Sequence, residues 1–328
     1  MYVTLLDNPP PSDTDDGASG AFDEPVGKVG DKVFFSLSFG AAALILVTLA
    51  AVAFFLFAQG LPTFTSDSTE LDGDASFFSY VGPLVFGTIY ISCIALLLAT
   101  PIAIAVALYI SHYAPRKIAK TLGYFIDLLA AIPSVVYGLW GIIVLAPVLS
   151  GSLFPWLRDN LGFLPFFGSD VAIAQSGRST FTVGVVLAVM VLPIITAISR
   201  EVFLQTPRLH EEASLALGAT RWEVIRQAVI PYGRSGVISG AMLGLGRALG
   251  ETMAVAIILS PARGYFWDVL TAQNSNSIAS NIALQFPESS GLEVNRLIAT
   301  GLVLFILTFV VNAIARRASN SGFSGADG

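Results

Sequence analysis

Residues 207–231 read PRLHEEASLALGATRWEVIRQAVIP, and this polar stretch between two apolar segments governs the interpretation of the whole chain. Gly218 is placed to end a first short helix, because glycine adopts the left-handed conformation after a helix end without strain. Thr220 and Glu223 have the spacing of a capping box, which is typical of a helix start. The stretch therefore predicts two short helices with a bend at Gly218.

The first of these helices also has a candidate start. Thr206 is placed to cap it, with Pro207 as the first helical residue, where a missing N–H costs little. In the second helix Trp222, Ile225 and Val229 recur at helical spacing, so we expect one apolar face on it.

The composition indicates a protein that crosses a membrane several times. Of the 328 residues, 54% are hydrophobic and 12% are charged, and a soluble domain carries about twice that charged fraction. The single cysteine, Cys93, excludes an intrachain disulfide. With two histidines, no nucleotide-binding glycine loop and no catalytic serine motif, the sequence predicts no metal site, no catalytic residue and no nucleic-acid partner.

The sequence predicts an all-α polytopic membrane protein with six transmembrane helices. Each apolar segment approaches the ~20 helical residues that a ~30 Å hydrocarbon core requires. The segments are continuous rather than alternating, which favours helices over a β-barrel. The six expected segments are Val33–Phe57, Gly82–Ile110, Thr121–Leu149, Phe181–Ser199, Ser235–Leu259 and Leu297–Ile314.

Basic residues predict the orientation of these segments. Twelve of the 17 Lys and Arg residues fall in one alternate set of connections and at the two termini. Cytoplasmic loops carry this excess, so both termini and residues 207–231 are expected in the cytoplasm. The predicted location is the cell membrane of a prokaryote.

The expected organisation follows from this orientation. Residues 1–30 hold six acidic residues and one lysine and have little to bury, so they predict a disordered acidic cytoplasmic tail. The expected parts after it are a first transmembrane helix at 31–60, an external loop at 61–80, a five-helix core at 81–316 with the loop at 207–231, and a second cytoplasmic tail at 317–328.

Two opposite charges lie within the fifth segment. Arg247 and Glu251 are four residues apart, so a continuous helix would place them on one face together with Gly236, Gly240 and Gly244. Charges inside a membrane must face protein or water. Either the two charges neutralise each other and fix helix packing, or Arg247 supplies positive potential for an anion while Glu251 orients Arg247 or is released from it. Asp127, in the third segment, is expected to pair with a surface Lys or Arg rather than to bind a substrate.

Several stretches carry a family resemblance. Glu212, Ala213, Gly218 and Pro231 match the EAA loop of ABC importer permeases in identity and spacing, with Ser214, Ala228 and Ile230 as substitutions. The further stretches AAIPSVVYGLWG (130–141), LPIITAISREVFLQTP (192–207) and GLGRALGETMAVA (244–256) look like the C-type permease subunits of phosphate-specific importers. The resemblance covers about residues 33–315.

This resemblance implies a type I ABC importer permease fold. It implies a subunit that forms half of a phosphate pathway and hydrolyses no ATP itself. The implied partners are an A-type permease, two ATPase subunits that hold ATP and Mg, an external phosphate-binding protein and membrane lipid. No cofactor is expected on this chain.

The resemblance and the charge pattern together give two sets of candidate residues. The substrate pathway is expected at Arg247, Glu251, Ser134 and Thr252. Coupling to the ATPase is expected at Glu211, Glu212, Ala213, Leu217, Gly218, Arg221 and Trp222. The alternatives are the A-type permease, a permease for another oxyanion, and, more distantly, an ion-coupled anion transporter or channel.

Overall fold

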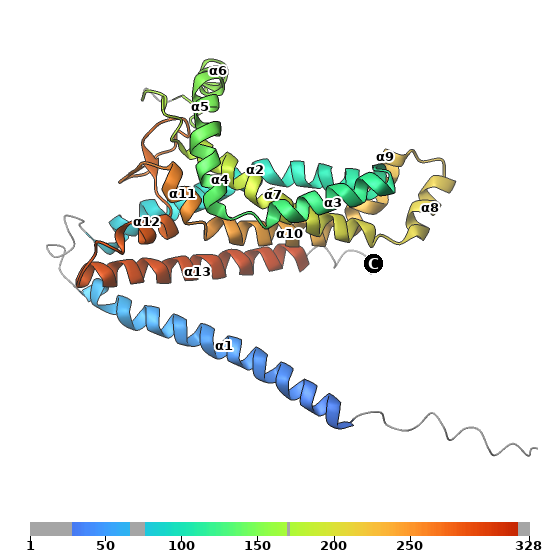
Figure 1. Ribbon diagram of the computed structural model, residues 1–328, viewed down its shortest axis with the longest axis horizontal. Helices are drawn as coiled ribbons and strands as arrows, with labels where there is room; N and C mark the ends of the chain where they lie inside the picture. Colours follow the sequence, from blue (N-terminus) through green and yellow to red (C-terminus); the bar gives the residue numbers. More distant parts are fainter. Residues whose placement is uncertain (1–27, 66–75, 169–170, 321–328) are drawn as a thin grey trace, which may run out of the picture. The chain divides into compact units, whose positions relative to one another are not determined.

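The computed structural model describes residues 28–65, 76–168 and 171–320. The described part is helical apart from short connections and one parallel pair of two-residue strands, β1 (Pro261–Ala262) and β2 (Asn274–Ser275) (Figure 1). The predicted all-α fold is therefore confirmed. Most of the two predicted tails lies outside the described residues.

The first helix, α1 (Lys28–Thr65), is longer than the predicted 31–60. Its last turns pack on the following helices: a Cβ on Gly60 would lie 3.2 Å from Ala299, and the rings of Phe64 and Phe77 meet edge to face at 4.9 Å. Because the next helix begins at Phe77, the predicted external loop at 61–80 is shorter than expected.

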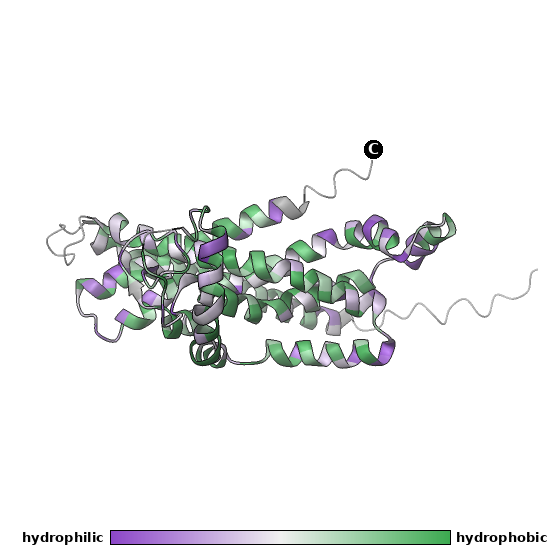
Figure 2. Cartoon of the chain, turned by 90° about the horizontal axis from the view of Figure 1, so that it is seen from above, coloured by the Kyte–Doolittle hydropathy of each residue, from purple (hydrophilic) through white to green (hydrophobic). Residues whose placement is uncertain are grey.

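Small residues bring the central helices together. In α2 (Phe77–Leu108), Ala95, Ala99, Ala103 and Ala107 recur every four residues and are fully buried, and the first three pack in one core with α7 (Thr180–Leu204). With no hydrophobic effect acting between helices in lipid, close packing of this kind holds them together. The polar loops lie at the ends of the apolar helices (Figure 2).

Glycines give the next helix the same close approach. In α10 (Ile230–Leu249), Gly236, Gly240 and Gly244 face Val202, Ile198 and Ile195 of α7, respectively, at distances that leave little room for a side chain. The predicted small-residue face therefore receives another helix. A further long helix, α13 (Leu292–Asn320), packs beside α10 and extends past the predicted boundary at 317.

The third predicted segment is divided at Pro133. The amphipathic helix α3 (Arg116–Ala130) ends before it, and α4 (Ser134–Trp140) begins directly after it. A proline lacks the N–H that a continuing helix needs and disfavours helical backbone at the residue before it. The predicted Thr121–Leu149 helix is therefore wrong, and Asp127 lies exposed on α3, without an ion pair to any Lys or Arg of the described chain.

From Ser134 the chain stays helical to Leu161. The helical turns after α4 are η3 (Gly141–Leu145), α5 (Ala146–Val148), η4 (Leu149–Leu153) and α6 (Phe154–Leu161). This continuous unit of 28 residues projects away from the other long helices in Figure 1. It is apolar enough to cross a membrane.

The fifth predicted segment is also broken. Its first part is α10, and after Gly250–Thr252 a second helix, α11 (Met253–Ile258), follows. Five helical units of the described chain are individually long and apolar enough to span a membrane, and the broken α10–α11 element, the fifth predicted segment, is not among them.

The end of the bundle predicted to be external is a compact cap. Phe154 and Leu157 of α6 pack with Val269 and Leu270, and Arg158 forms an ion pair of 2.9 Å with Asp268. The short helix α12 (Ile278–Gln285) completes this end. Residues 207–231, called the coupling stretch below, lie at the opposite end (Figure 1).

Candidate functional site

The turn at Gly218 is built as the sequence predicts. Helix α8 (Arg208–Ala216) ends there, and Gly218 has a φ of +85°. Its N–H donates to Leu215 O at 2.9 Å, while the N–H of Ala219 donates to Ser214 O at 3.2 Å. These two bonds make a Schellman motif, which satisfies carbonyls at the helix end.

The second short helix is also confirmed. It begins as α9 (Arg221–Val224) and continues as η5 (Ile225–Val229). Glu223 Oε2 accepts hydrogen bonds from Thr220 N at 2.7 Å and Thr220 Oγ1 at 2.8 Å, while Glu223 N donates to Thr220 Oγ1. The bonds from the Thr220 backbone and then its side chain lower the pKa of the Glu223 carboxyl below its usual value.

The start of α8 differs from the prediction. Pro207 occupies the cap position itself, and the helix begins at Arg208. The side chain of Thr206 is buried and makes no capping bond. The cap expected at Thr206 is therefore wrong, and so is Pro207 as the first helical residue.

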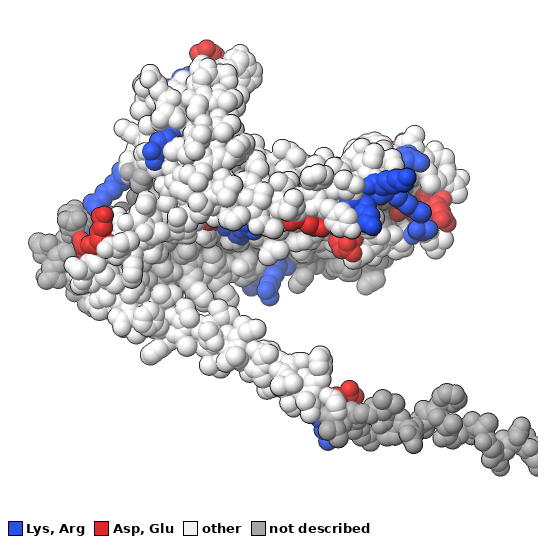
Figure 3. Space-filling view, in the orientation of Figure 1, with Lys and Arg blue, Asp and Glu red and all other residues white. Residues whose placement is uncertain are grey.

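The residues predicted to couple to an ATPase form an exposed surface, with one exception. Leu217 is 90% exposed and Trp222 is 57% exposed, whereas Ile225 and Val229, which share the predicted apolar face with Trp222, are buried. Glu212, Ala213, Gly218 and Arg221 are exposed too. Charged residues of both signs gather at this end of the molecule (Figure 3).

The exception is Glu211, whose side chain is only 28% exposed. It faces His112 in η2 (Tyr109–Tyr113), the continuation of α2, with 3.6 Å between Oε1 and Nε2. Beneath the exposed surface, Ile225 and Val229 are buried against Phe203 and Leu108, and this cluster anchors the stretch to the bundle.

In the second candidate site, Arg247 and Glu251 are not partners. The helix ends at Leu249, so Glu251 leaves the face on which a continuous helix would put it. Its carboxylate is buried and accepts a hydrogen bond from Ala254 N at 3.0 Å. Within the described residues the two charges form no ion pair, so the structure does not support the first alternative, mutual neutralisation.

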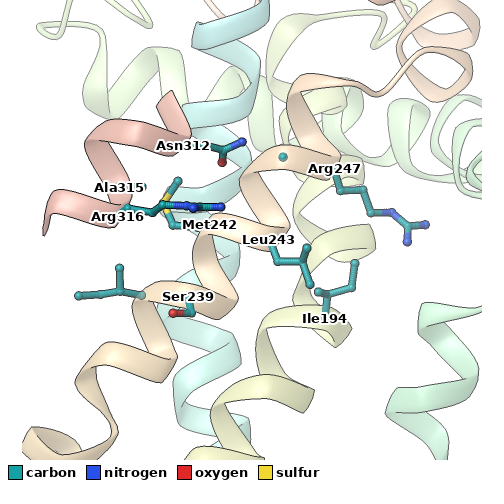
Figure 4. A pocket seen from close by; sticks show the side chains of 10 residues that line it. Ile194, Ser239, Met242, Leu243, Arg247, Asn312, Ala315 and Arg316 are labelled. Carbon is teal, nitrogen blue, oxygen red and sulfur yellow. The ribbon is translucent and has the colours of Figure 1, made fainter. Parts of the chain in front are cut away.

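Arg247 is half-buried and lines an open cavity of about 780 Å³ between α7, α10 and α13. The other polar lining residues are Ser239, Asn312 and Arg316, and no acidic residue lines the cavity. Figure 4 shows that the Arg247 side chain points away from Arg316, so the two guanidinium groups do not converge.

Ser134 and Thr252 do not line this cavity, but each lies at the start of a short helix, Ser134 in α4 and Thr252 before α11. Gly138 packs against Ala254 and Gly141 packs against Ile258, so α4 and α11 run parallel. Their first residues are therefore at the same end, which brings Ser134 toward Glu251 and Thr252. The Thr252 hydroxyl donates to Gly250 O at 3.2 Å.

Sequence reasoning missed some of these residues. Arg316 was used only as one of the basic residues that predict the orientation in the membrane. Its four-residue spacing from Asn312 puts both side chains on one face of α13, which could have indicated a shared site. Arg178 gave no signal, yet its guanidinium donates to the carbonyls of Ile257, Ile258 and Leu259 at 3.1–3.3 Å. It thereby caps the far end of α11.

The described residues contain no group of three or more His, Cys, Asp or Glu side chains that could hold a metal ion. Broken helices inside a membrane bundle, together with an exposed two-helix loop at one end, are features found in membrane transport proteins.

Comparisons with known proteins are consistent with this class. Residues 99–320 match the family described as "Binding-protein-dependent transport system inner membrane component". "Phosphate transport system permease protein PstC 2" of Mycobacterium tuberculosis is 43% identical over 90% of this chain and 94% of that protein. "Phosphate transport system permease protein PstC" of Xylella fastidiosa (strain Temecula1) is 40% identical over 86% of this chain and 89% of that protein.

Solved structures agree on the fold. A crystal structure of a bacterial alginate ABC transporter in complex with a periplasmic protein matches with a TM-score of 0.56 and 15% identity, over 90% of this chain and 97% of that one. An inward-facing methionine ABC transporter matches with a TM-score of 0.53 and 15% identity, over 74% and 96%. The chain thus has an ABC importer permease fold, and it belongs to the family of binding-protein-dependent transport system inner membrane components.

Proposed function

We propose that this permease carries inorganic phosphate into the cell as the C-type subunit of a phosphate-specific ABC importer. The single observation that carries the substrate is the 43% identity, over nearly the full length of both chains, with a protein named as a phosphate transport permease. Arg247, which forms no ion pair with a described residue and lies beside a cavity without acidic lining, supports an anionic substrate, because a fixed cation offsets part of the cost of bringing an anion into the membrane.

The substrate residues then have distinct roles. Arg247 supplies positive potential along the pathway. Ser134 and Thr252 offer hydroxyl groups near the parallel starts of α4 and α11. Glu251 fixes the start of α11 through Ala254 rather than touching the anion.

The exposed surface of α8 and α9 is proposed to bind an ATPase subunit. Leu217 and Trp222 bury apolar surface against it, and Glu212 and Arg221 supply charged contacts. Two ATPase copies, an A-type permease and an external phosphate-binding protein complete the importer. ATP and Mg bind to the ATPase, both termini of the permease lie in the cytoplasm, and closure of the ATPase dimer switches the helices as rigid bodies.

Uptake into vesicles that hold the complete complex tests this proposal. Radiolabelled phosphate is expected to accumulate when ATP is supplied inside, and labelled sulfate and molybdate are not. Accumulation of sulfate or molybdate in place of phosphate would refute the substrate, and uptake by this chain without any ATPase would refute the coupling.

A further inference from the structure

The coupling helix α8 is weakly attached to the rest of the molecule. None of its residues is buried, and its main neighbours are α9 and η5, which follow it in the chain. A cavity of about 240 Å³, lined by Tyr113, Leu215 and Arg221 among others, separates it from the end of α2. The position of α8 relative to α2 therefore depends on few side chains.

Glu211 and His112 lie at this cavity and connect its two sides. The Glu211 Oε1–His112 Nε2 separation of 3.6 Å is an ion-pair distance rather than a hydrogen bond. Neither side chain is fully exposed, at 28% and 14%. The neighbouring Glu212 is exposed and has no ion pair to a described residue, so the inward contact belongs to Glu211 alone within this acidic pair.

The imidazole ring of His112 is held in place by the helix it belongs to. Its Nδ1 lies 2.7 Å from Ser111 Oγ, and that hydroxyl also lies 2.8 Å from the carbonyl oxygen of Ala107. Because Nδ1 is tied to the backbone of α2 in this way, Nε2 is presented across the cavity. The Ser111 hydroxyl donates its proton to the Ala107 carbonyl, so the Nδ1–H of His112 donates to Ser111 Oγ, and the ring attracts the Glu211 carboxylate when Nε2 also carries a proton.

The helix that receives this contact runs the length of the bundle. α2 packs along α7 through its alanine stripe. Toward its other end, Thr88 Oγ1 accepts a hydrogen bond of 2.9 Å from the N–H of Ile278 at the start of α12. A displacement of η2 would therefore act on a helix that is packed from one end of the molecule to the other.

We propose that the Glu211–His112 contact is a strut that positions the coupling helix α8 on α2 and passes movement of α8 directly to the bundle. It acts across the cavity, in parallel with the peptide chain at Thr206 and Pro207. Both residues are positioning residues, since neither touches the substrate. This inference rests on the proposed function for its transport consequence, but the attachment of α8 itself does not depend on it.

Transport and ATP hydrolysis by the assembled complex form the first test. Glu211→Gln and His112→Gln are each expected to lower phosphate transported per ATP roughly two- to fivefold, the range for a partly exposed pair, while ATP hydrolysis continues. The double variant should lose no more than either single variant. The exchange His112→Glu with Glu211→His should restore at least half of the loss, which a purely structural role for either residue would not allow. Glu201→Gln, an exposed charge at the same end of α7, is the matched control.

A second measurement needs no ATPase. A spin label at Ala216→Cys, in a Cys93→Ala background, reports the motion of α8 in the purified permease. Glu211→Gln should increase the mobility of the label, and the exchanged pair should reverse the increase. Unchanged label mobility together with normal transport per ATP would overturn the strut. Increased mobility in a complex that transports no phosphate would instead reject the proposed function and leave the strut standing.

Discussion

Oε1 of Glu251 accepts a hydrogen bond from the backbone nitrogen of Ala254 at 3.0 Å. The acid therefore caps the start of α11, a helix of six residues whose far end is held by the guanidinium of Arg178. Both ends of this short helix are fixed by side chains, although its own backbone bonds are few. The break between α10 and α11 therefore has a defined geometry, which side-chain hydrogen bonds hold in place.

The cap predicts different results for two substitutions of Glu251. Glu251→Gln keeps an oxygen acceptor and should change the stability of the permease little. Glu251→Ala leaves the buried N–H of Ala254 without a partner, which costs about 1–2 kcal/mol. Thermal unfolding of the purified permease measures both. Equal destabilisation by the two variants would contradict the capping role and point to the charge itself.

Because Arg247 and Glu251 are separated, we expect that removing the charge of Glu251 does not restore the uptake lost when the charge of Arg247 is removed. Arg247→Gln should reduce phosphate uptake at least tenfold, because an intramembrane charge that faces a cavity is worth more than ~1.4 kcal/mol to an anion. Arg247→Lys should retain most uptake. The double variant Arg247→Gln with Glu251→Gln should remain as defective as Arg247→Gln alone, and recovery in the double variant would show that the two charges do neutralise each other.

The left-handed conformation of Gly218 predicts a local effect on coupling. A side chain here would meet no neighbour within 4 Å, so the cost comes from the backbone at φ +85°. Gly218→Val should cost about 1–2 kcal/mol in the loop and should leave the permease in the membrane while ATPase co-purification falls. Gly218→Asn is the control, since asparagine tolerates this conformation. Co-purification unaffected by valine would contradict the prediction.

Local rules predicted the coupling stretch well. The Gly218 turn and the Thr220–Glu223 box depend on residues three or four positions apart, and both formed as expected. Periodicity and length also located the long helices of the bundle, because a run of apolar residues must be buried or lie in lipid whatever its partners are.

Errors arose where tertiary structure broke a helix or redirected a side chain. A hydropathy pattern does not show that α3 ends before Pro133, nor that α10 stops at Leu249. The four-residue spacing of Arg247 and Glu251 places two side chains on one face only in a continuous helix, and the helix ends between them. The inward turn of Glu211 depends on His112, about 100 residues earlier in the chain, and Arg178 acts on carbonyls about 80 residues later. No local pattern contains these contacts.

The capping box at Thr220 predicts a pH dependence of the second coupling helix. Hydrogen bonds from Thr220 hold the pKa of Glu223 below its ordinary value of 4.5. A lowered pKa means that the box stabilises the helix above that ordinary value, and the stabilisation is lost as the pH falls through the folded-state pKa. Thr220→Ala keeps the backbone N–H bond, which is the larger cause, and removes only the hydroxyl bond, so the Glu223 titration should move part of the way up toward 4.5, which NMR of the labelled carboxyl carbon would detect. An unchanged titration would show that the Thr220 hydroxyl does not contribute to the lowered pKa.

Arg178 predicts a role for the cap around Arg158 and Asp268 in holding α11. Its guanidinium donates to three successive carbonyls at the end of that helix, and its own carbonyl accepts from Asn274 Nδ2 at 3.1 Å. Arg178→Gln should lose most of these bonds and destabilise the permease by about 2–3 kcal/mol, since buried acceptors would be left unpaired. Lysine is a point charge that cannot reach three oxygens in one plane, so the stability of Arg178→Lys should lie between that of the unsubstituted permease and that of Arg178→Gln. Hydrogen exchange at the amides of Val255 to Leu259 measures the effect where it should occur, and faster exchange there without faster exchange in α7 would show that the residue acts on α11 in particular.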